Sequence, residues 1–372
     1  MCNSPLHAFD TGYFTEKGGK AYRICSGDTY VINKPVNDLP WGKITTRRLY
    51  SNKPSNQYSD VLLRDYVDIP CGKCMQCRLD YTRAWAIRCY LESLDWTENY
   101  MVTLTYDNEH VPKGPTGNLT LNPKDVELFM KRLREHQERK HNRQIRFFLA
   151  GEYGGDDEYT DNKGVKRKGT ERPHYHFIAY NLNCNDLIPF FRNEFNQQVY
   201  LCPEIAKIWG KGQVTVCECN WNTCAYVARY ILKKQKGSEA EEYYNQKGIV
   251  PEFTRMSRSP GIAKAYYDAH KEEIWKGDEI VIRKQKIDER YQLTEEVVRV
   301  KPPKYFMQLY ELEEPDMAES LKQFRKEQAK ASKEMALMRT TMSEQEYLAE
   351  AERRLLKKIK NIRHEMFKEA EG

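Results

Sequence analysis

The chain has 372 residues, of which 31% are charged and 40% hydrophobic, and its net charge is +6. This length suffices for one sizeable core with extensions, and no run is long or apolar enough to span a bilayer, which excludes a membrane-spanning helix. No cationic region followed by an apolar run opens the chain, so we expect a cytoplasmic protein. Residues 311–372 carry 13 Lys and Arg against 14 Asp and Glu, so the positive excess lies before them. We expect an acidic partner there.

Three cysteines near the end of the first 80 residues have the spacing of metal ligands. In a reducing cytoplasm the 11 cysteines are expected to be thiols or metal ligands. Cys71, Cys74 and Cys77 precede a predicted helix, and Cys2 or Cys25 could complete a tetrahedral structural zinc site. The alternative is three reduced thiols beside a turn. The spacing alone decides neither the fourth ligand nor between these interpretations.

Apolar periodicity and turn signals predict eight elements. In chain order they are a helix at 77–95, a strand at 100–106, a helix at 123–140, strands at 145–152 and 173–180, a helix at 185–198, a strand at 213–219 and a helix at 223–236. The β-α-β-β-α-β-α order from the first strand predicts an α+β fold, a split βαβ, ferredoxin-like layer with an antiparallel sheet packed against helices. This core would span 99–275. An amino-terminal extension with the cysteines (1–98) and a strand-containing, mainly helical region (276–372) would flank it.

One predicted strand carries two histidines on the same face. Side chains alternate along a strand, so His174 and His176 point the same way and can share a cation. Glu152, at the end of the preceding apolar strand, is the preferred third ligand, which gives a two-histidine, one-carboxylate site with open positions. Glu171, in an expected loop, is the alternative carboxylate. The competing interpretation is a pair of structural histidines.

The last predicted helix carries two tyrosines one turn apart. Asn222 or Thr223 is expected to cap the start of this helix, and Gly237 is expected to end it. Its apolar stripe consists of Val227, Ala228, Ile231 and Leu232. The opposite face is expected to present Tyr226 and Tyr230 beside the cations Arg229 and Lys233, so both phenols can reach one bound phosphate.

A cation and a tyrosine pair suit transesterification of a DNA phosphodiester. The cation would polarise the phosphate while a tyrosine oxygen attacks in line, leaving a 5′-phosphotyrosine and a free 3′-hydroxyl. A phenol has a reference pKa of about 10, so we expect Arg229 and Lys233 to favour its ionisation. The phosphotyrosine bond conserves the energy needed to reseal a circle.

The motifs occur in an order that resembles a known family. The matching stretches are Val102–Tyr106, Gly151–Gly154 leading to Arg172–His176, Tyr226–Lys234, Pro70–Arg78 and Met256–Gly261. Together they resemble the HUH endonucleases and, more closely, the replication initiator proteins of gokushovirus-like microviruses, which are small circular single-stranded DNA phages. The sequence departs from the shorter family pattern through a polar insert at 155–171, between the carboxylate and the histidines.

This resemblance implies a role for each motif in rolling-circle replication. The residues that it assigns to Mg²⁺ or Mn²⁺ are His174, His176 and Glu152. Tyr226 and Tyr230 would alternate as covalent nucleophiles. Lys233 and Lys234 would assist at the phosphate. The implied partners are the single-stranded origin of a circular phage genome and the host helicase and DNA polymerase in the bacterial cytoplasm, with no membrane.

Further contacts and two other functions remain open. The candidate DNA-binding residues are Arg172, Arg229 and Arg258, and a solvated loop is the alternative for Arg258. Residues 316–370 predict a long helix with a break at 340–343, which could dock on the core or contact a host factor. The alternative function is a non-catalytic, zinc-containing single-stranded nucleic-acid binding protein. A transposase-like relative is a third candidate, disfavoured by the paired tyrosines.

Overall fold

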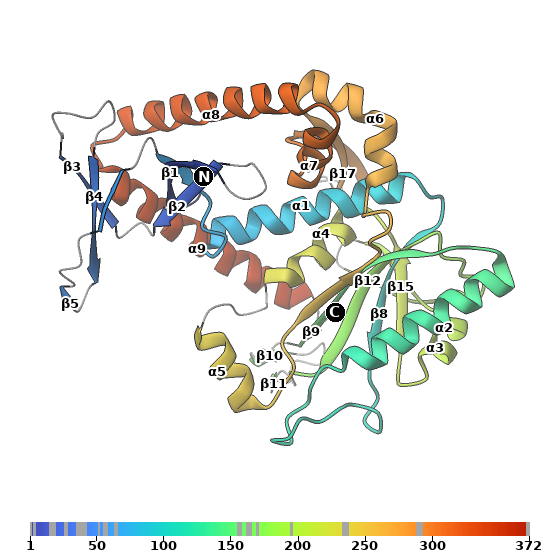
Figure 1. Ribbon diagram of the computed structural model, residues 1–372. Helices are drawn as coiled ribbons and strands as arrows, with labels where there is room; N and C mark the ends of the chain where they lie inside the picture. The colour runs from blue at the N-terminus through green and yellow to red at the C-terminus, as the bar shows by residue number, and fades with distance from the viewer. Residues whose placement is uncertain are drawn as a thin grey trace. The chain divides into compact units, whose positions relative to one another are not determined.

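The chain folds into two compact units. The computed structural model describes residues 2, 5–14, 20–25, 29–34, 43–50, 53–54, 59–62, 66–154, 158–160, 166–168, 171–193, 196–232, 238–287 and 293–369. The amino-terminal unit consists of Met1–Arg78 and Glu334–Ile359, and the central unit consists of Leu79–Lys333 and Lys360–Gly372 (Figure 1).

The central unit is built on a seven-stranded antiparallel sheet with the order β13-β14-β15-β8-β12-β9-β16. In that order the strands are Ile188–Arg192, Gln198–Leu201, Val214–Glu218, Asn99–Thr105, Pro173–Tyr180, Arg146–Tyr153 and Phe253–Met256. The four predicted strands are therefore confirmed, and they are neighbours in the middle of the sheet. An antiparallel sheet with helices makes this a mixed α+β fold.

Helices cover both faces of this sheet (Figure 1). One face is covered by α2 (Pro123–His141) and α3 (Pro203–Trp209), and the other by α1 (Met75–Leu94) and α4 (Trp221–Arg229). Side chains alternate along β9, so Leu149 packs in the core beneath α2 and Phe148 packs in the core beneath α1. Burial on both faces explains why this strand is a continuous apolar run in the sequence.

The ends of α2 follow from local sequence signals. Asn122 is the amino-terminal cap, and its side chain accepts a hydrogen bond of 3.0 Å from the amide of Lys124. Pro123 occupies the first helical position, where its missing amide hydrogen costs nothing. Asn142 ends the helix with φ of 54°. The predicted helix at 123–140 is confirmed, because the residues that start and end it are recognisable in the local sequence.

The start and end of α4 differ from the prediction. The cap is Asn220, which exchanges hydrogen bonds with Thr223 in a capping box: Thr223 N donates to Asn220 Oδ1 at 3.1 Å, and Asn220 N donates to Thr223 Oγ1 at 2.8 Å. The prediction of Asn222 or Thr223 as the cap is wrong by two or three residues. The α-helix ends at Arg229 and continues as a 3₁₀ turn, Tyr230–Leu232.

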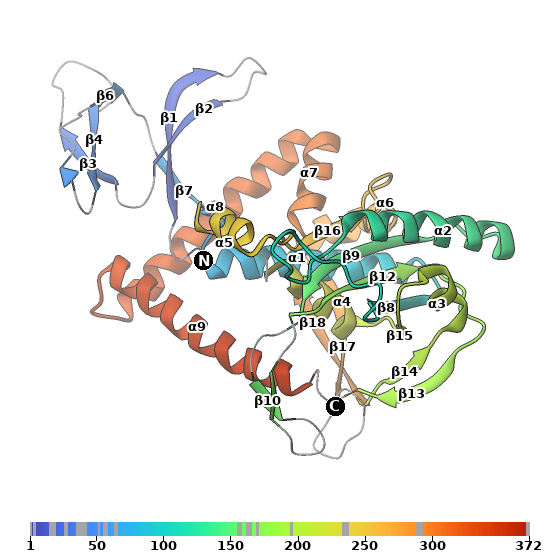
Figure 2. The ribbon, with the colours of Figure 1, turned by 90° about the horizontal axis from the view of Figure 1, so that it is seen from below.

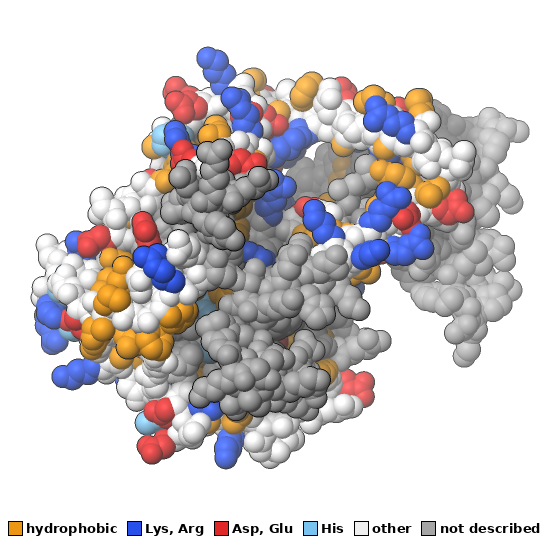
Figure 3. Space-filling view, turned by 180° about the vertical axis from the view of Figure 1, so that it is seen from behind, with side chains coloured by type: hydrophobic (Ala, Val, Ile, Leu, Met, Phe, Trp, Pro, Cys, Tyr) orange, Lys and Arg blue, Asp and Glu red, His pale blue; other side chains and the backbone are white. Residues whose placement is uncertain are grey.

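The helix predicted at 185–198 is wrong. The segment forms the hairpin β13–β14, which Figure 2 shows extending from the sheet, and the short helix α3 follows it. The hairpin exposes Ile188, Phe190 and Phe191, and Figure 3 shows hydrophobic side chains gathered on one part of the face opposite to Figure 1. Pro189 disfavours a helix interior and the aromatic neighbours are compatible with a strand, and the pairing of β14 with β15 decides for the hairpin.

The remaining elements agree with a mainly helical carboxyl-terminal region. They are α5 (Ser238–Lys247), α6 (Lys264–Gly277), β17 (Ile280–Ile287), β18 (Leu293–Val300), α7 (Lys304–Glu313), α8 (Pro315–Met338) and α9 (Glu344–Glu369). The predicted break at 340–343 is confirmed, because α8 ends at Met338 and α9 begins at Glu344. Ser343 caps the new helix, since its amide donates to Oε2 of Glu346 at 2.8 Å. Across the described ranges, no helix combines the length and apolarity that crossing a bilayer requires.

The amino-terminal unit contains strands that were not predicted. One sheet has the order β2-β1-β7, and in another β4 pairs with β3, β5 and β6. Their bounds are Leu6–Phe14 (β1), Lys20–Cys25 (β2), Thr29–Lys34 (β3), Lys43–Tyr50 (β4), Lys53–Pro54 (β5), Ser59–Leu62 (β6) and Tyr66–Ile69 (β7). A small hairpin, β10 (Glu158–Thr160) with β11 (Lys166–Lys168), lies in the insert of the central unit.

Candidate metal and tyrosine site

Strand register brings the predicted ligands together. On β12, His174 lies opposite Glu152 of β9, and His176 lies opposite Thr103 of β8. Cross-strand partners in an antiparallel pair place their side chains on the same face. The insert does not disturb this pairing, because the amide of Gly154 donates to the carbonyl oxygen before the strand, that of Arg172, at 3.0 Å.

Three potential ligand groups converge on this face. The Nε2 atom of His174 lies 2.7 Å from Oε1 of Glu152, and Nε2 of His176 lies 3.3 Å from the same oxygen. One ligand atom from each residue lies within 4.8 Å of the other two. The side chains are sheltered from solvent, since Glu152 is 1% exposed and His176 is 5% exposed. A carboxylate buried between imidazoles requires a positive charge, from a proton or from a metal ion.

The orientation of His174 favours a metal ligand. Its Nδ1 atom lies 3.0 Å from the carbonyl oxygen of Arg172. A carbonyl oxygen only accepts hydrogen bonds, so Nδ1 carries a proton, and as a metal ligand the ring would present its Nε2 lone pair on the side of Glu152. When Nε2 of His174 and Oε1 of Glu152 both present lone pairs, they repel each other at 2.7 Å unless a proton or a metal cation lies between them. Metal-bound histidines commonly hold their second nitrogen in this way.

Thr103 orients the second histidine. Its Oγ1 atom lies 2.9 Å from Nδ1 of His176. The hydroxyl can accept a hydrogen bond from the protonated Nδ1, which leaves Nε2 of His176 directed at Glu152. This role was not predicted, because it depends on the register between β8 and β12. The only signal in the sequence was that Thr103 and Thr105 share one face of their strand.

Two other predicted residues near the histidines have different partners. Glu171, the alternative carboxylate, lies 2.5 Å from Nζ of Lys247 and does not join the group. Arg172 donates to the carbonyl oxygen of Tyr106 at 2.8 and 3.2 Å and to Oδ1 of Asn108 at 2.9 Å. Arg172 therefore ties the end of β8 to the start of β12. Its contact with DNA stays a prediction.

The tyrosine between the histidines anchors the opposite face of β12. The hydroxyl of Tyr175 lies 3.0 Å from that of Tyr106, which donates to Asp125 at 2.9 Å. The amide of Asn122 donates to Tyr175 at 2.9 Å. A Cβ atom at Gly151 would lie 3.0 Å from the Tyr175 ring, so the residue before Glu152 has little room for a side chain. This packing holds β9 and β12 in register.

Both tyrosines of the α4 region lie against His176. The Tyr230 ring stacks on the imidazole with a centroid distance of 4.7 Å and an angle of 3°. Tyr226 packs edge-on at 5.3 Å, and the phenol rings are 5.0 Å apart. The prediction that both tyrosines lie on a polar face opposite the apolar stripe is wrong for Tyr230, which is 6% exposed and belongs to the same core as Val227, while Tyr226 is half-buried against that core. The helix packs on the sheet, so the phenols face buried Glu152.

The site makes both phenols weaker acids. Burial and then the charge of Glu152 raise the pKa of Tyr226 to about 12. The same causes raise the pKa of Tyr230 well above its usual value, and its hydroxyl is hydrogen-bonded to Glu152 and Tyr226. Arg229 lowers the pKa of Tyr226 without offsetting burial, and burial lowers the pKa of Arg229 itself. The expected direction of the Arg229 effect on the Tyr226 pKa is therefore confirmed, but burial outweighs it, and a cation at Glu152 would oppose the largest charge effect on this pKa.

These pKa values predict a loss of stability at alkaline pH. The unfolded phenol of Tyr226 ionises near pH 10, whereas the folded phenol ionises near pH 12. Between these values the unfolded state binds fewer protons, so the free energy of unfolding falls as pH rises. Tyr226→Phe/Tyr230→Phe should reduce this fall, measured by urea unfolding at pH 8, 10 and 11. Tyr81→Phe, at a 52% exposed position, is the control. Equal pH dependence in all three proteins would contradict the prediction.

The structure describes only some of the other predicted contact residues. Lys233 and Lys234 lie outside the described residues. Arg258 is exposed in the turn between β16 and α6. Nε of Arg229 donates to the carbonyl oxygen of Ala225 at 3.3 Å, one turn earlier on α4. DNA binding by these arginines stays a prediction.

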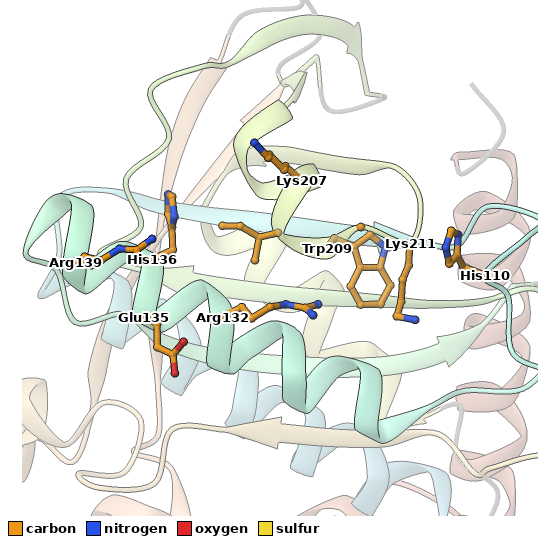
Figure 4. A pocket seen from close by; sticks show the side chains of 10 residues that line it. His110, Arg132, Glu135, His136, Arg139, Lys207, Trp209 and Lys211 are labelled. Atoms are coloured by element: carbon orange, nitrogen blue, oxygen red, sulfur yellow. The ribbon is translucent and has the colours of Figure 1, made fainter.

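A separate cavity lies on the face covered by α2 and α3. It has a volume of about 540 Å³. Its lining residues are His110, Arg132, Glu135, His136, Arg139, Lys207, Ile208, Trp209, Gly210 and Lys211. Figure 4 shows the cationic side chains arranged around it. The sheet separates this basic hollow from the tyrosines, so it is not part of the site described above.

Comparison with known proteins places the site in a phage family. A family model for replication-associated proteins of the ORF2 type matches residues 99–235, which include all the residues of the histidine and tyrosine site. The replication-associated protein ORF2 of Spiroplasma virus 4 is 30% identical over 333 residues, 88% of this chain and 95% of the relative. Replication-associated protein VP4 of Bdellovibrio phage phiMH2K is 31% identical over 218 residues, 57% of this chain and 62% of the relative.

A third relative, replication-associated protein ORF4 of Chlamydia phage 1, is 30% identical over 170 residues, 45% of this chain and 38% of the relative. No solved structure matches. The likeness to the Spiroplasma virus protein extends over nearly the whole of both chains. The chain therefore belongs to the ORF2-type family of replication-associated proteins of phages, the microvirus-type replication initiators.

Proposed function

We propose that this protein initiates rolling-circle replication by nicking single-stranded DNA at the phage origin through tyrosine transesterification. The observation that carries the proposal is one group of side chains: His174, His176 and Glu152 share ligand distances, and Tyr226 and Tyr230 pack against His176. A strand transferase needs such a phosphate-binding centre beside its nucleophile. The same nucleophile chemistry permits religation to a circle.

The topology supports an HUH-type core. The four middle strands have the order β15-β8-β12-β9, so each pair linked through a helix is split by a strand of the other pair. This is the split βαβ, ferredoxin-like arrangement. It puts the histidines on a central strand and the tyrosines of the α4 region across the same face, the arrangement that the resemblance implies.

A divalent cation fits the ligand set. Two imidazole nitrogens and one buried carboxylate oxygen converge, and the His174 lone pair faces that oxygen at 2.7 Å. His174, His176 and Glu152 would hold Mg²⁺ or Mn²⁺, which would supply Lewis-acid polarisation of the scissile phosphate. Thr103 and the carbonyl oxygen of Arg172 keep the two imidazoles in the required tautomer.

The chain's own tyrosine performs the covalent step. The phenol gives up its proton and forms an O–P bond, while the bond from phosphorus to the 3′ oxygen breaks and that oxygen takes up a proton. The products are a 5′-phosphotyrosine and a 3′-hydroxyl, so the number of phosphoester bonds is unchanged. Burial raises the pKa of Tyr226 to about 12, so the phenol is protonated at neutral pH and must lose its proton during the attack.

The partners follow from what the sequence contains. The chain has no Gly-x-x-x-x-Gly-Lys-Ser/Thr loop for nucleotide hydrolysis. We infer that the host helicase unwinds the duplex and the host polymerase extends the 3′-hydroxyl. The candidate DNA contacts Arg172, Arg229 and Arg258 would bind phosphates, with Lys233 and Lys234 assisting at the scissile phosphate.

The test is capture of the covalent intermediate. Single-stranded origin oligonucleotides labelled at the 5′ or the 3′ end are incubated with the full chain and Mn²⁺, and products are resolved on a denaturing gel. The expected result is a divalent-dependent adduct that carries only the 3′-side label and maps to Tyr226 or Tyr230 by mass spectrometry. Tight binding without an adduct on several origin sequences would overturn the nuclease and favour the nucleic-acid binding protein.

Thr103 is expected to act as a positioning residue. Thr103→Val removes the hydrogen bond to His176, and Mn²⁺ affinity and nicking rate should both fall by roughly 10–100-fold. Isothermal titration with Mn²⁺ and the adduct assay measure the two effects. Thr105→Val is the matched control, because its hydroxyl donates instead to the carbonyl oxygen of Gln213 at 3.1 Å. A loss of nicking at unchanged Mn²⁺ affinity would contradict this role.

A further inference from the structure

We propose that Cys2, Cys71, Cys74 and Cys77 bind a structural zinc ion in the amino-terminal unit, independently of the nicking chemistry. Their Sγ atoms all lie within 4.8 Å of one another, and those of Cys2 and Cys74 are 3.7 Å apart. Four sulfurs at ~2.3 Å from zinc form a tetrahedron with edges of about 3.8 Å. A disulfide would require about 2.05 Å. The thiols therefore have the spacing of zinc ligands.

Backbone amides are directed at two of the sulfurs. The amides of Lys73 and Cys74 donate to Sγ of Cys71 at 3.4 and 3.2 Å, and the amide of Cys71 donates to Sγ of Cys2 at 3.3 Å. Gly72 has φ of 70°, which turns the chain so that both following amides face the Cys71 sulfur. Such donors offset the negative charge of zinc-bound thiolates. The turn therefore directs amide donors at two sulfurs that would carry negative charge when bound to zinc.

Strand pairing selects Cys2 as the fourth ligand. On β1, Leu6 pairs with Ile69 of β7, so the residues just before β1 and just after β7 emerge at the same end of the sheet. Cys2 precedes that pair and Cys71 follows it. Cys25 pairs with His7 on the other side of β1, and its side chain lies outside the described residues. The open choice between Cys2 and Cys25 is thus decided for Cys2 by the register of the sheet.

The ligand set indicates a closed, structural site. Four cysteines fill a tetrahedral coordination shell, whereas a catalytic zinc keeps one position for water. All-sulfur tetrahedral sites select zinc or iron. Bound zinc would join the residues before β1 to the first turn of α1, and so close a loop between Cys2 and Cys71, which are 69 positions apart. A crosslink that closes a long loop stabilises the fold most, because it removes the most conformational entropy from the unfolded chain. We expect this tie to hold the β2-β1-β7 sheet in place.

A second group of potential ligands provides an internal comparison. His136, His141 and Glu204 also bring ligand atoms within 4.8 Å of one another. Here the ammonium of Lys140 already contacts the Glu204 carboxylate, together with Nε2 of His136 at 3.0 Å. A metal ion would have to displace a cation from its partner. We therefore expect the group of His136, His141 and Glu204 to bind no zinc.

The experiment is metal analysis of the full chain purified without chelators. Plasma mass spectrometry should find about one zinc ion per chain, released when a thiol reagent is added. In a Glu152→Gln background, which removes a ligand of the histidine site, Cys2→Ser and Cys77→Ser should each reduce zinc to near none. The control, Cys219→Ser, alters a thiol that lies 3.5 Å from Cys224 outside the group and should retain full zinc. Replacement by Co²⁺ should produce the visible bands of a tetrahedral thiolate site.

Each result decides the proposal even if a variant loses its amino-terminal fold. Mn²⁺-dependent stabilisation reports on the central unit and should persist in Cys2→Ser, so zinc loss with a folded central unit supports the site. No zinc in the wild type and no cobalt bands after reconstitution would overturn it. Iron in place of zinc, or zinc retained in both cysteine variants, would also overturn it. None of these results depends on DNA cleavage, so the nicking proposal stands or falls separately.

Discussion

Glu152→Gln is expected to abolish divalent-dependent nicking while preserving the fold. The substitution keeps the shape of the side chain but removes the negative charge that His174 and His176 share. A direct ligand should contribute more than the roughly 10–100-fold of a residue that only orients one, so the loss should exceed ~100-fold. Adduct formation with Mn²⁺ is the measurement.

Thermal unfolding separates loss of metal binding from loss of fold. Free cation at ~100 times its dissociation constant stabilises by about 2.7 kcal/mol, or roughly 5–11 °C for a domain of this size. The wild type should show this shift and Glu152→Gln should not. Without metal the variant should be at least as stable, because a buried carboxylate costs free energy. The control is Glu171→Gln, whose carboxylate pairs with Lys247. An unchanged Mn²⁺ shift in Glu152→Gln would refute the ligand assignment.

Substitution of the two tyrosines is expected to block different steps of the reaction. Tyr226 is the more accessible phenol, whereas Tyr230 is buried flat against the His176 ring. We therefore expect Tyr226→Phe to lose the first cleavage and Tyr230→Phe to cleave but not to transfer the strand to a second origin. The double variant should form no adduct. Removing a covalent nucleophile leaves only metal-assisted hydrolysis, so each affected step should fall by several orders of magnitude, ~10³-fold or more.

An oligonucleotide pair separates these steps. The first strand, labelled on the 3′ side, reports cleavage, and an unlabelled acceptor with a free 3′-hydroxyl reports transfer. Tyr90→Phe alters a tyrosine of α1 that packs on Trp221 away from the histidines and serves as the control. Full cleavage and transfer by the Tyr226→Phe/Tyr230→Phe variant would exclude both residues as nucleophiles. If Tyr230→Phe lost cleavage and Tyr226→Phe lost only transfer, the proposed chemistry would stand and only the order of the two nucleophiles would be corrected.

Secondary structure was predictable where its signals are local. Alternating apolar residues located the middle strands, and Asn122 with Pro123 marked the start of α2. The segment at 185–198 was mispredicted because its apolar residues suit either a helix or a strand, and pairing of β14 with β15 decides for the strand. The cap of α4 was misplaced because Asn220, Asn222 and Thr223 lie close together and each has a side chain that can cap, whereas only Asn220 completes a box with Thr223.

The sequence by itself determined the identity of the chemistry-bearing residues. A spacing of two puts His174 and His176 on one strand face, and a spacing of four puts Tyr226 and Tyr230 on one helix side, because strand and helix periods are properties of the local backbone. The cysteine spacing identified three thiols of a possible metal site in the same way. These conclusions need no knowledge of the rest of the fold.

Only the tertiary structure decided which distant residues complete each group. The register of β9 with β12 puts Glu152 opposite His174, the register of β8 puts Thr103 on His176, and the pairing of β1 with β7 brings Cys2 to Cys71. It also decided that the phenols are buried, which reversed the expected direction of their pKa shift. Register and burial depend on summed contacts between segments far apart in the chain, and no local pattern encodes that sum.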